Sequence, residues 1–109
     1  MQFATYLPTV YNDGRRVPKR EFNAILMEAV DLFGGYSLSE LQKGAWKDET
    51  GKVYTDNSHK LTVVCDNSKL AEAESFVIRA GQRLGQLAMY FEVRDFDGVR
   101  ILDVPKPNA

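Results

Sequence analysis

The chain has 109 residues, of which 44% are hydrophobic and 27% are charged, a composition typical of one globular domain and not of a disordered chain. Its formal net charge of -1 gives no overall field that would draw it onto nucleic acid or an anionic membrane. Cys65 is the only cysteine, so an internal disulfide is excluded and a reducing compartment is favoured. Without a signal-like start or a run of about 18 apolar residues, the sequence predicts a cytoplasmic protein with no membrane partner.

The first third predicts a strand followed by a helix. Residues 3–10 mix aromatic, β-branched and small side chains and end at the turn signal of residues 12–14. Pro18 suits the first turn of a helix, and the pair Gly34-Gly35 suits its end. Between them, apolar side chains recur on one helical face, at Phe22, Ile25, Leu26, Ala29, Val30 and Phe33.

The middle third predicts two strands. Residues 36–47 begin as an alternating strand and become irregular, with a bulge expected at Gly44. Residues 48–51 form a turn, after which residues 52–55 and 61–65 return as strand. The polar insert at residues 56–59 is expected to interrupt the pairing.

The last third predicts a helix and further strands. Residues 66–68 all suit a helix N-cap, the apolar residues from Leu70 to Leu84 keep helical spacing, and Gly85 ends the helix. Residues 87–94 alternate strictly between apolar and polar or small side chains, as a strand does. A turn at Asp97-Gly98 leads into a short strand, Val99 to Val104, and residues 105–109 are expected to fray.

This order predicts an α+β fold over residues 1–109, a ferredoxin-like β-α-β-β-α-β sandwich with an antiparallel sheet and an extra C-terminal strand. Both helices would cover one face of the sheet and leave the other open. The residues expected on the open face are Ala4, Tyr6, Thr62, Val64 and Tyr90. This set is too apolar to be exposed to water, which predicts a homodimer or higher oligomer.

Catalytic and metal-binding patterns are weak. His59 is the only histidine, and on a regular strand it would lie about 20 Å from Cys65, too far for a nucleophile and its base. We therefore interpret His59 as an exposed loop residue and Cys65 as a buried structural thiol. The sequence predicts no catalytic residue, metal site or cofactor, and it favours a protein that is not an enzyme.

Two segments are candidates for binding. The first is the basic loop formed by Arg15, Arg16, Lys19 and Arg20, which is interpreted first as a solvated loop and second as a group that could grip a phosphate. In the second segment Trp46, the only tryptophan, is either packed under the first helix or a contact anchor. The charged residues of this predicted hairpin turn, taken with Trp46 as one contact surface, are Lys47, Asp48, Glu49 and Lys52.

Four groups of residues resemble a known pattern: Tyr6-Leu7-Pro8-Thr9, the turn Asn12-Asp13-Gly14, the step at residues 32–37 that contains Phe-Gly-Gly, and the hairpin at residues 44–51 of the form Gly-x-Trp-x-Asp-x-x-Gly. Together they resemble a group of small prokaryotic and phage proteins. The resemblance spans about residues 6–65 and implies a fold but no catalytic residue. The predicted topology is also similar to that of PII-type regulatory trimers and dimeric α+β-barrel proteins, which are analogies of fold.

We therefore expect a non-enzymatic, oligomeric binding or regulatory module that presents the hairpin and the basic loop to a small anionic ligand or a protein partner. Two alternatives stay open. One is a small cofactor-independent enzyme with a pocket at the subunit interface. The other is a weak nucleic-acid binder that uses residues 15–20, although no aromatic RNA-binding signature is present.

Overall fold

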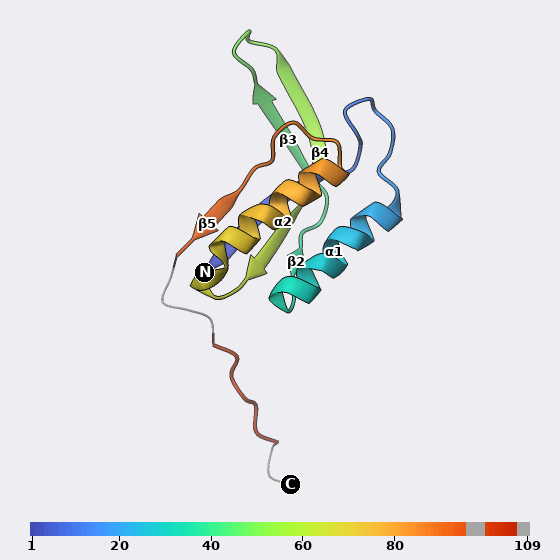
Figure 1. Ribbon diagram of the computed structural model, residues 1–109. Coiled ribbons are helices and arrows are strands. Elements are labelled where there is room, and N and C mark those ends of the chain that lie inside the picture. Colours follow the sequence, from blue (N-terminus) through green and yellow to red (C-terminus); the bar gives the residue numbers. More distant parts are fainter. Residues whose placement is uncertain (96–99, 107–109) are drawn as a thin grey trace.

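In the computed structural model, which describes residues 1–95 and 100–106, two helices and a five-stranded sheet form two layers (Figure 1). The strands are β1 (Gln2–Pro8), β2 (Ser37–Leu38), β3 (Gln42–Lys47), β4 (Val53–Val64) and β5 (Glu92–Arg94). β1 lies between β4 and β5, while β2 and β3 both pair with the other edge of β4, and every pairing is antiparallel. This is the order of a ferredoxin-like α+β fold, so the predicted fold class is confirmed.

Both predicted helices form and lie on the same face of the sheet (Figure 1). α1 (Lys19–Phe33) follows Pro18 and ends at Gly34, whose φ of 88° lets its N–H bond the carbonyl oxygen of Val30 at 2.8 Å. A short 3-10 turn, η1 (Asn67–Lys69), is capped by Asp66 and leads into α2 (Leu70–Arg83). Neither helix of the described chain is long and apolar enough to cross a membrane.

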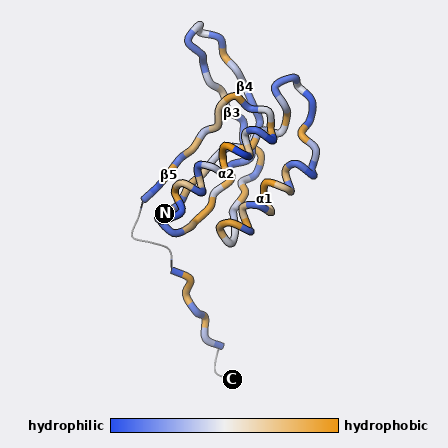
Figure 2. The backbone as a smooth tube through the Cα atoms, viewed as in Figure 1, coloured by the Kyte–Doolittle hydropathy of each residue, from blue (hydrophilic) through white to orange (hydrophobic). Residues whose placement is uncertain are grey.

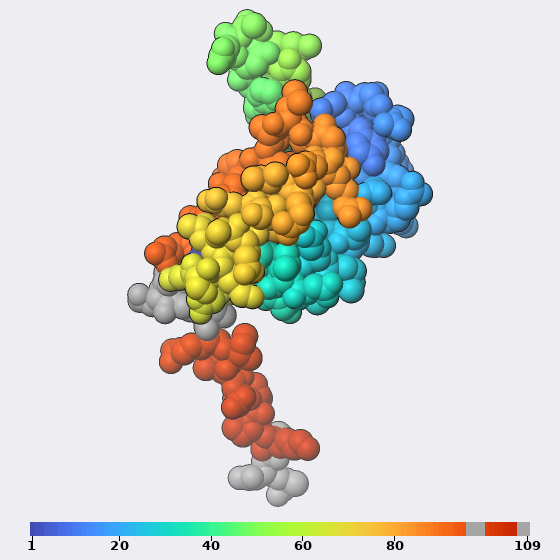
Figure 3. Space-filling model, in the orientation of Figure 1, coloured from blue at the N-terminus to red at the C-terminus, as the bar shows by residue number. Residues whose placement is uncertain are grey.

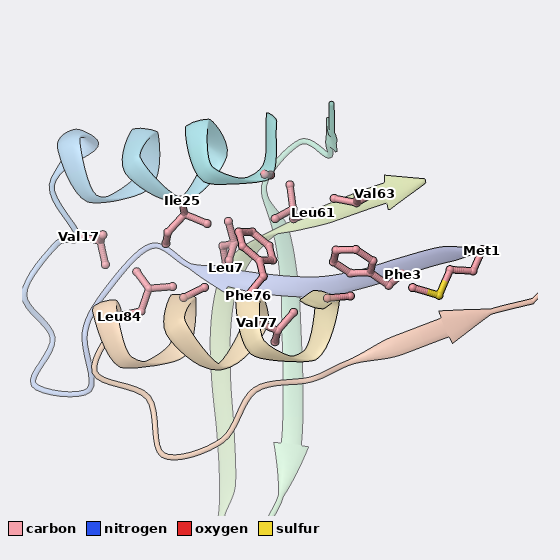
Figure 4. Close-up of a cluster of buried hydrophobic side chains, with 13 residues drawn as sticks. Met1, Phe3, Leu7, Val17, Ile25, Leu61, Val63, Phe76, Val77 and Leu84 are labelled. Atoms are coloured by element: carbon pink, nitrogen blue, oxygen red, sulfur yellow. The ribbon is translucent and has the colours of Figure 1, made fainter. Parts of the chain in front are cut away.

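The core lies between the helices and the sheet (Figure 4). Because side chains alternate along a strand, Phe3 and Leu7 of β1 point toward the helices with Leu61 of β4, and all three are fully buried. The Phe3 ring lies 5.1 Å from that of Phe33 on α1 and 6.2 Å from that of Phe76 on α2. Residues 4, 6, 58 and 60 therefore belong to the opposite face, which the helices leave open.

β3 and the first half of β4 form a two-stranded arm that projects from the body (Figures 1 and 3). The expected interruption at residues 56–59 is wrong, because β4 runs through this insert in regular register with β3. The expected bulge at Gly44 is also wrong, since Gly44 pairs regularly with Asp56. The break falls instead at residues 39–41. The Ser39 N–H still donates to the carbonyl oxygen of Lys60 at 2.9 Å, but the Ser39 hydroxyl oxygen, not a backbone carbonyl, accepts the N–H of Lys60 at 2.7 Å.

The C-terminal part differs most from the prediction. Of the strand expected at residues 87–94 only β5 forms, and in the segment before it the Thr5 side chain, not a backbone ladder, donates to the carbonyl oxygen of Tyr90. The extra strand from Val99 to Val104 is absent from its described part, residues 100–104, which lacks a strand partner. Val99 and residues 107–109 of the expected frayed tail lie outside the described residues.

Candidate functional site

A concave pocket of about 590 Å³ lies between the arm and the body, on the sheet face opposite the helices. We call it the open-face pocket. Its walls come from β1, β3, β4 and the segment that joins α2 to β5, and they are lined by Tyr6, Pro8, residues 42–46, Asp56, Ser58, Gln86 and residues 88–90. The register explains this gathering, because Asp56 pairs with Gly44 and Ser58 pairs with both Pro8 and Gln42. Residues paired in this way point to the same face of a sheet.

Aromatic side chains flank the pocket on two sides. On the body, the rings of Tyr6 and Tyr90 lie 5.2 Å apart. On the arm, Trp46 stacks on Tyr54 with their ring centroids 4.5 Å apart and their planes 16° from parallel. Trp46 keeps 55% of its surface exposed and lies far from α1 in the fold, so the interpretation that it packs under the first helix is wrong. The other interpretation, a contact anchor, stays a prediction.

The polar groups of the pocket are concentrated on β4. Ser58 is buried, whereas the Asp56 carboxylate is exposed and lies across the bare backbone of Gly44. A β-carbon at position 44 would come within 2.7 Å of Asp56 Oδ1, so only glycine leaves the carboxylate in this place. Within the described residues, the Asp56 side chain has no hydrogen bond or ion pair. It is therefore available to a ligand.

A charged network holds Tyr90 at the edge of the pocket. The Tyr90 hydroxyl donates to Glu92 Oε1 at 3.0 Å, and Lys60 Nζ lies 3.5 Å from Glu92 Oε2. The hydrogen bond from Tyr90 lowers the pKa of Glu92, with Lys60 adding to the effect, and the same bond raises the pKa of Tyr90. Glu92 therefore stays ionised, and the phenol stays protonated, near neutral pH.

The predicted turn residues form the tip of the arm. The Asp48 carboxylate accepts the N–H groups of Thr50 at 2.9 Å and Lys52 at 3.0 Å, and also the Thr50 and Tyr54 hydroxyls. These bonds, led by the Thr50 hydroxyl, lower the pKa of Asp48. Lys52 Nζ lies 4.9 Å from the centre of the Tyr54 ring, and Lys47 is exposed. Asp48 thus shapes the turn, while Trp46 reaches the pocket.

The basic loop is a separate protrusion on the body (Figure 1). Arg15 Nε bonds Asp13 Oδ2 at 2.7 Å and its guanidinium lies 5.1 Å from the centre of the Tyr11 ring. Arg16 pairs with Val10, and Lys19 is the first residue of α1. No hydrogen bond, ion pair or pocket wall in the described chain joins these residues to the arm. The structure therefore does not bring the two predicted halves of the contact surface together.

The histidine and the cysteine both belong to the β4 region. His59 is in β4, half-buried, with its ring 5.7 Å from that of Phe22 and Nδ1 3.0 Å from the carbonyl oxygen of Ser39, so its placement in an exposed loop is wrong. Cys65 is half-buried, and burial raises the pKa of its thiol. Among the described residues no group of three or more His, Cys, Asp or Glu side chains could hold a metal ion.

Most of the pocket lies outside the residues that the sequence patterns single out for binding. Strand alternation predicts that Tyr6 and Tyr90 lie on the open face, but the apolar character of that face predicts contact with a partner chain and not a ligand pocket. The same patterns place Asp56 and Ser58 in a loop, because four polar residues in a row resemble a turn. The only sequence signal that groups Asp56 with Ser58 is their even spacing. Residues 54, 56, 58 and 60 lie on the same face of the sheet once the strand is known to be continuous.

The fold and the pocket define a ferredoxin-like α+β protein with an open-face cavity at the base of a β-arm. No family model and no curated protein matches the sequence. A solved structure is similar to the chain: a phage SAM lyase in complex with S-methyl-5'-thioadenosine, with a TM-score of 0.68 and 10% identity over 86% of this chain and 79% of that one. This likeness concerns the fold, and the resemblance stated from the sequence motifs stays a prediction.

Proposed function

We propose that the protein is a small-ligand-binding module and that the open-face pocket is its ligand site. The observation that carries the proposal is the combination of aromatic rings and available polar groups on the walls of one cavity. Its volume of about 590 Å³ falls in the range of small-molecule sites, which are mostly apolar with a few placed polar groups.

The chemistry of the walls favours a nucleoside-like ligand. The rings of Tyr6, Trp46 and Tyr90 offer faces on which a planar base can stack. The Asp56 carboxylate and the Ser58 hydroxyl can accept hydrogen bonds from ribose hydroxyls. The similar phage protein is in complex with S-methyl-5'-thioadenosine, which supports the same class of compound.

The charges argue for a neutral or zwitterionic ligand in place of the anionic one expected from the sequence. Lys43 is the only cationic residue among the described wall residues, and Asp56 adds one negative charge to the same wall. Lys60, a further cation on this face, is paired with Glu92. A phosphorylated ligand would find no cluster of cations on the described walls.

A second candidate is an enzyme that acts on S-adenosylmethionine (SAM) in the same pocket. The specific observation in its favour is that the similar phage protein is a SAM lyase. The binding proposal expects S-methyl-5'-thioadenosine to bind and SAM to stay intact, whereas the enzyme proposal expects SAM to be converted.

Calorimetric titration tests the proposal. The titrants are S-methyl-5'-thioadenosine, adenosine and adenosine monophosphate, and we expect the first two to bind more tightly than the nucleotide. Asp56→Ala and Trp46→Ala should each weaken binding by about tenfold or more, as expected for loss of a charged hydrogen bond or a stacked ring. Lys47→Ala, on the arm but outside the pocket wall, is the matched control. Absence of binding by all three titrants, or binding that neither pocket variant weakens, would refute the proposal.

Chromatography of a mixture of protein and SAM separates the two candidates. Formation of S-methyl-5'-thioadenosine that Asp56→Ala abolishes and Lys47→Ala preserves would establish the enzyme. Intact SAM, together with measurable binding in the calorimeter, would establish the binding module.

A further inference from the structure

The segment after β5 carries unusual apolar exposure. Residues 100–106 extend away from the body at the end opposite the arm (Figures 1 and 3). In this segment Ile101 is 89% exposed, Leu102 is 74% exposed and Val104 is 89% exposed, and Figure 2 shows hydrophobic residues along it. An extended strip with this much aliphatic surface is a typical mark of a segment that binds another surface.

A second cavity, of about 370 Å³, lies on the helical side of the molecule. It is a groove between α2 and the segment that joins α2 to β5, and its walls are mostly apolar. Two of its residues are far more exposed than core residues: Ile78 at 61% and Leu87 at 99%. We call it the α2 groove.

The floor of the α2 groove depends on Gly81. A β-carbon at this position would come within 2.7 Å of Met89 Cγ, so glycine lets the Met89 side chain lie directly against the helix. Val77 and Phe91 continue the apolar lining, and Glu74 adds a carboxylate to the wall. The groove is thus apolar along its length with an acidic group on it.

We propose that the α2 groove binds residues 101–104 of a second copy of this chain, and that two copies exchange these segments reciprocally. Leu102 and Val104 alternate with Ile101 and Asp103, so an extended segment presents an apolar pair to the groove. Arg100 precedes the pair and complements Glu74 of the receiving chain.

The geometry favours a second copy over the same chain. Residues 100–106 lie away from the body (Figure 1), whereas the groove is lined by residues of α2 and by residues that precede β5. Reciprocal exchange buries twice the surface that a single tail in a single groove would bury. The total area then comes closer to the roughly 1,000 Å² that a specific interface needs. The groove shares Gln86, Ala88 and Met89 with the wall of the open-face pocket, but the residues changed in the test below, Ile78, Leu102 and Val104, do not line that pocket.

Sedimentation equilibrium of the full chain tests the exchange. We expect the wild type to be a dimer at micromolar concentrations, and both Leu102→Asp/Val104→Asp and Ile78→Asp to weaken dimerisation by about tenfold or more. Met27→Asp is the matched control, because Met27 is 58% exposed on α1 and outside the groove. Circular dichroism verifies that each variant is folded, and the tail variant alone suffices if Ile78→Asp does not fold.

Mixing provides a second arm of the test. The tail variant retains an intact groove and the Ile78→Asp variant retains an intact tail, so their mixture should recover dimers through one tail and groove pair. A monomeric wild type of 12.3 kDa, a tail variant that dimerises like the wild type, or a mixture that associates no more than either variant alone would each overturn the proposal.

Discussion

The carboxylate of Asp56 lies across the backbone of Gly44 on the neighbouring strand, with Oδ1 2.7 Å from the position that a β-carbon of residue 44 would occupy. The two residues are direct partners in the β3–β4 register. Glycine at this point is therefore not a break in the strand, as its sequence position indicated, but the space that an acidic side chain occupies on the wall of the open-face pocket.

Gly44→Ala should weaken nucleoside binding while leaving the fold almost unchanged. The new methyl group must displace the Asp56 carboxylate, which is exposed and free to rotate, so the cost in stability should stay below about 1 kcal/mol. Loss of a charged hydrogen bond to the ligand would reduce affinity by about tenfold or more. Calorimetry and thermal unfolding measure the two effects. Gly35→Ala, where a β-carbon meets nothing within 4 Å, should change neither, and equal affinity in both variants would contradict the role of Asp56.

Trp46→Ala should separate binding from stability. The Trp46 indole contacts the Tyr54 ring, and Trp46 is 55% exposed. The free energy of unfolding should therefore fall by about 1 kcal/mol, the contribution of an aromatic pair. A buried aromatic residue behaves differently, and Phe76→Ala should cost about 3–5 kcal/mol. Urea unfolding of both variants provides the comparison. If Trp46→Ala were as destabilising as Phe76→Ala, the contact-anchor prediction would be wrong.

The tip of the arm should lose order in acid because of Asp48. Hydrogen bonds to its carboxylate lower its pKa below the ordinary aspartate value of 3.8, so the stabilisation is present above that value and disappears as pH falls through the folded pKa. NMR titration of the Thr50 and Lys52 amide signals should show this transition. In Asp48→Asn the two amides should no longer titrate together, and an unchanged titration in that variant would assign the effect to another group.

Reversing the charge of the basic loop should leave the pocket unaffected. Arg15→Glu/Arg16→Glu alters a protrusion that contributes no wall residue, so affinity for S-methyl-5'-thioadenosine should change by less than about twofold. The same variant tests the alternative of nucleic-acid binding, whose affinity should fall steeply as salt rises and should depend on these arginines. A large loss of nucleoside affinity would mean that the loop and the arm act as one surface.

Local sequence patterns were sufficient to predict the two helices and the order of the main elements along the chain. The apolar stripe that contains Ile25 and Ala29, with Pro18 before it and Gly34 after it, specifies where α1 begins, where it ends and which face is buried. These signals act within about four residues, so they can be read without knowing what packs nearby. The order of strand and helix signals along the chain then predicted the ferredoxin-like fold.

Long-range pairing decided the site. The continuity of β4 through Asp56 and His59 depends on its partner β3, whose backbone supplies the hydrogen bonds that polar side chains alone do not predict. The position of Trp46 depends on how far the arm extends beyond the helices, and the segment before β5 is joined to β1 by a bond from Thr5, 85 positions away from Tyr90. The sequence by itself determined the two helices, their buried faces and the order of the main elements through local periodicity and capping. Only the tertiary structure decided which polar side chains meet around the pocket, because register joins residues that are distant along the chain.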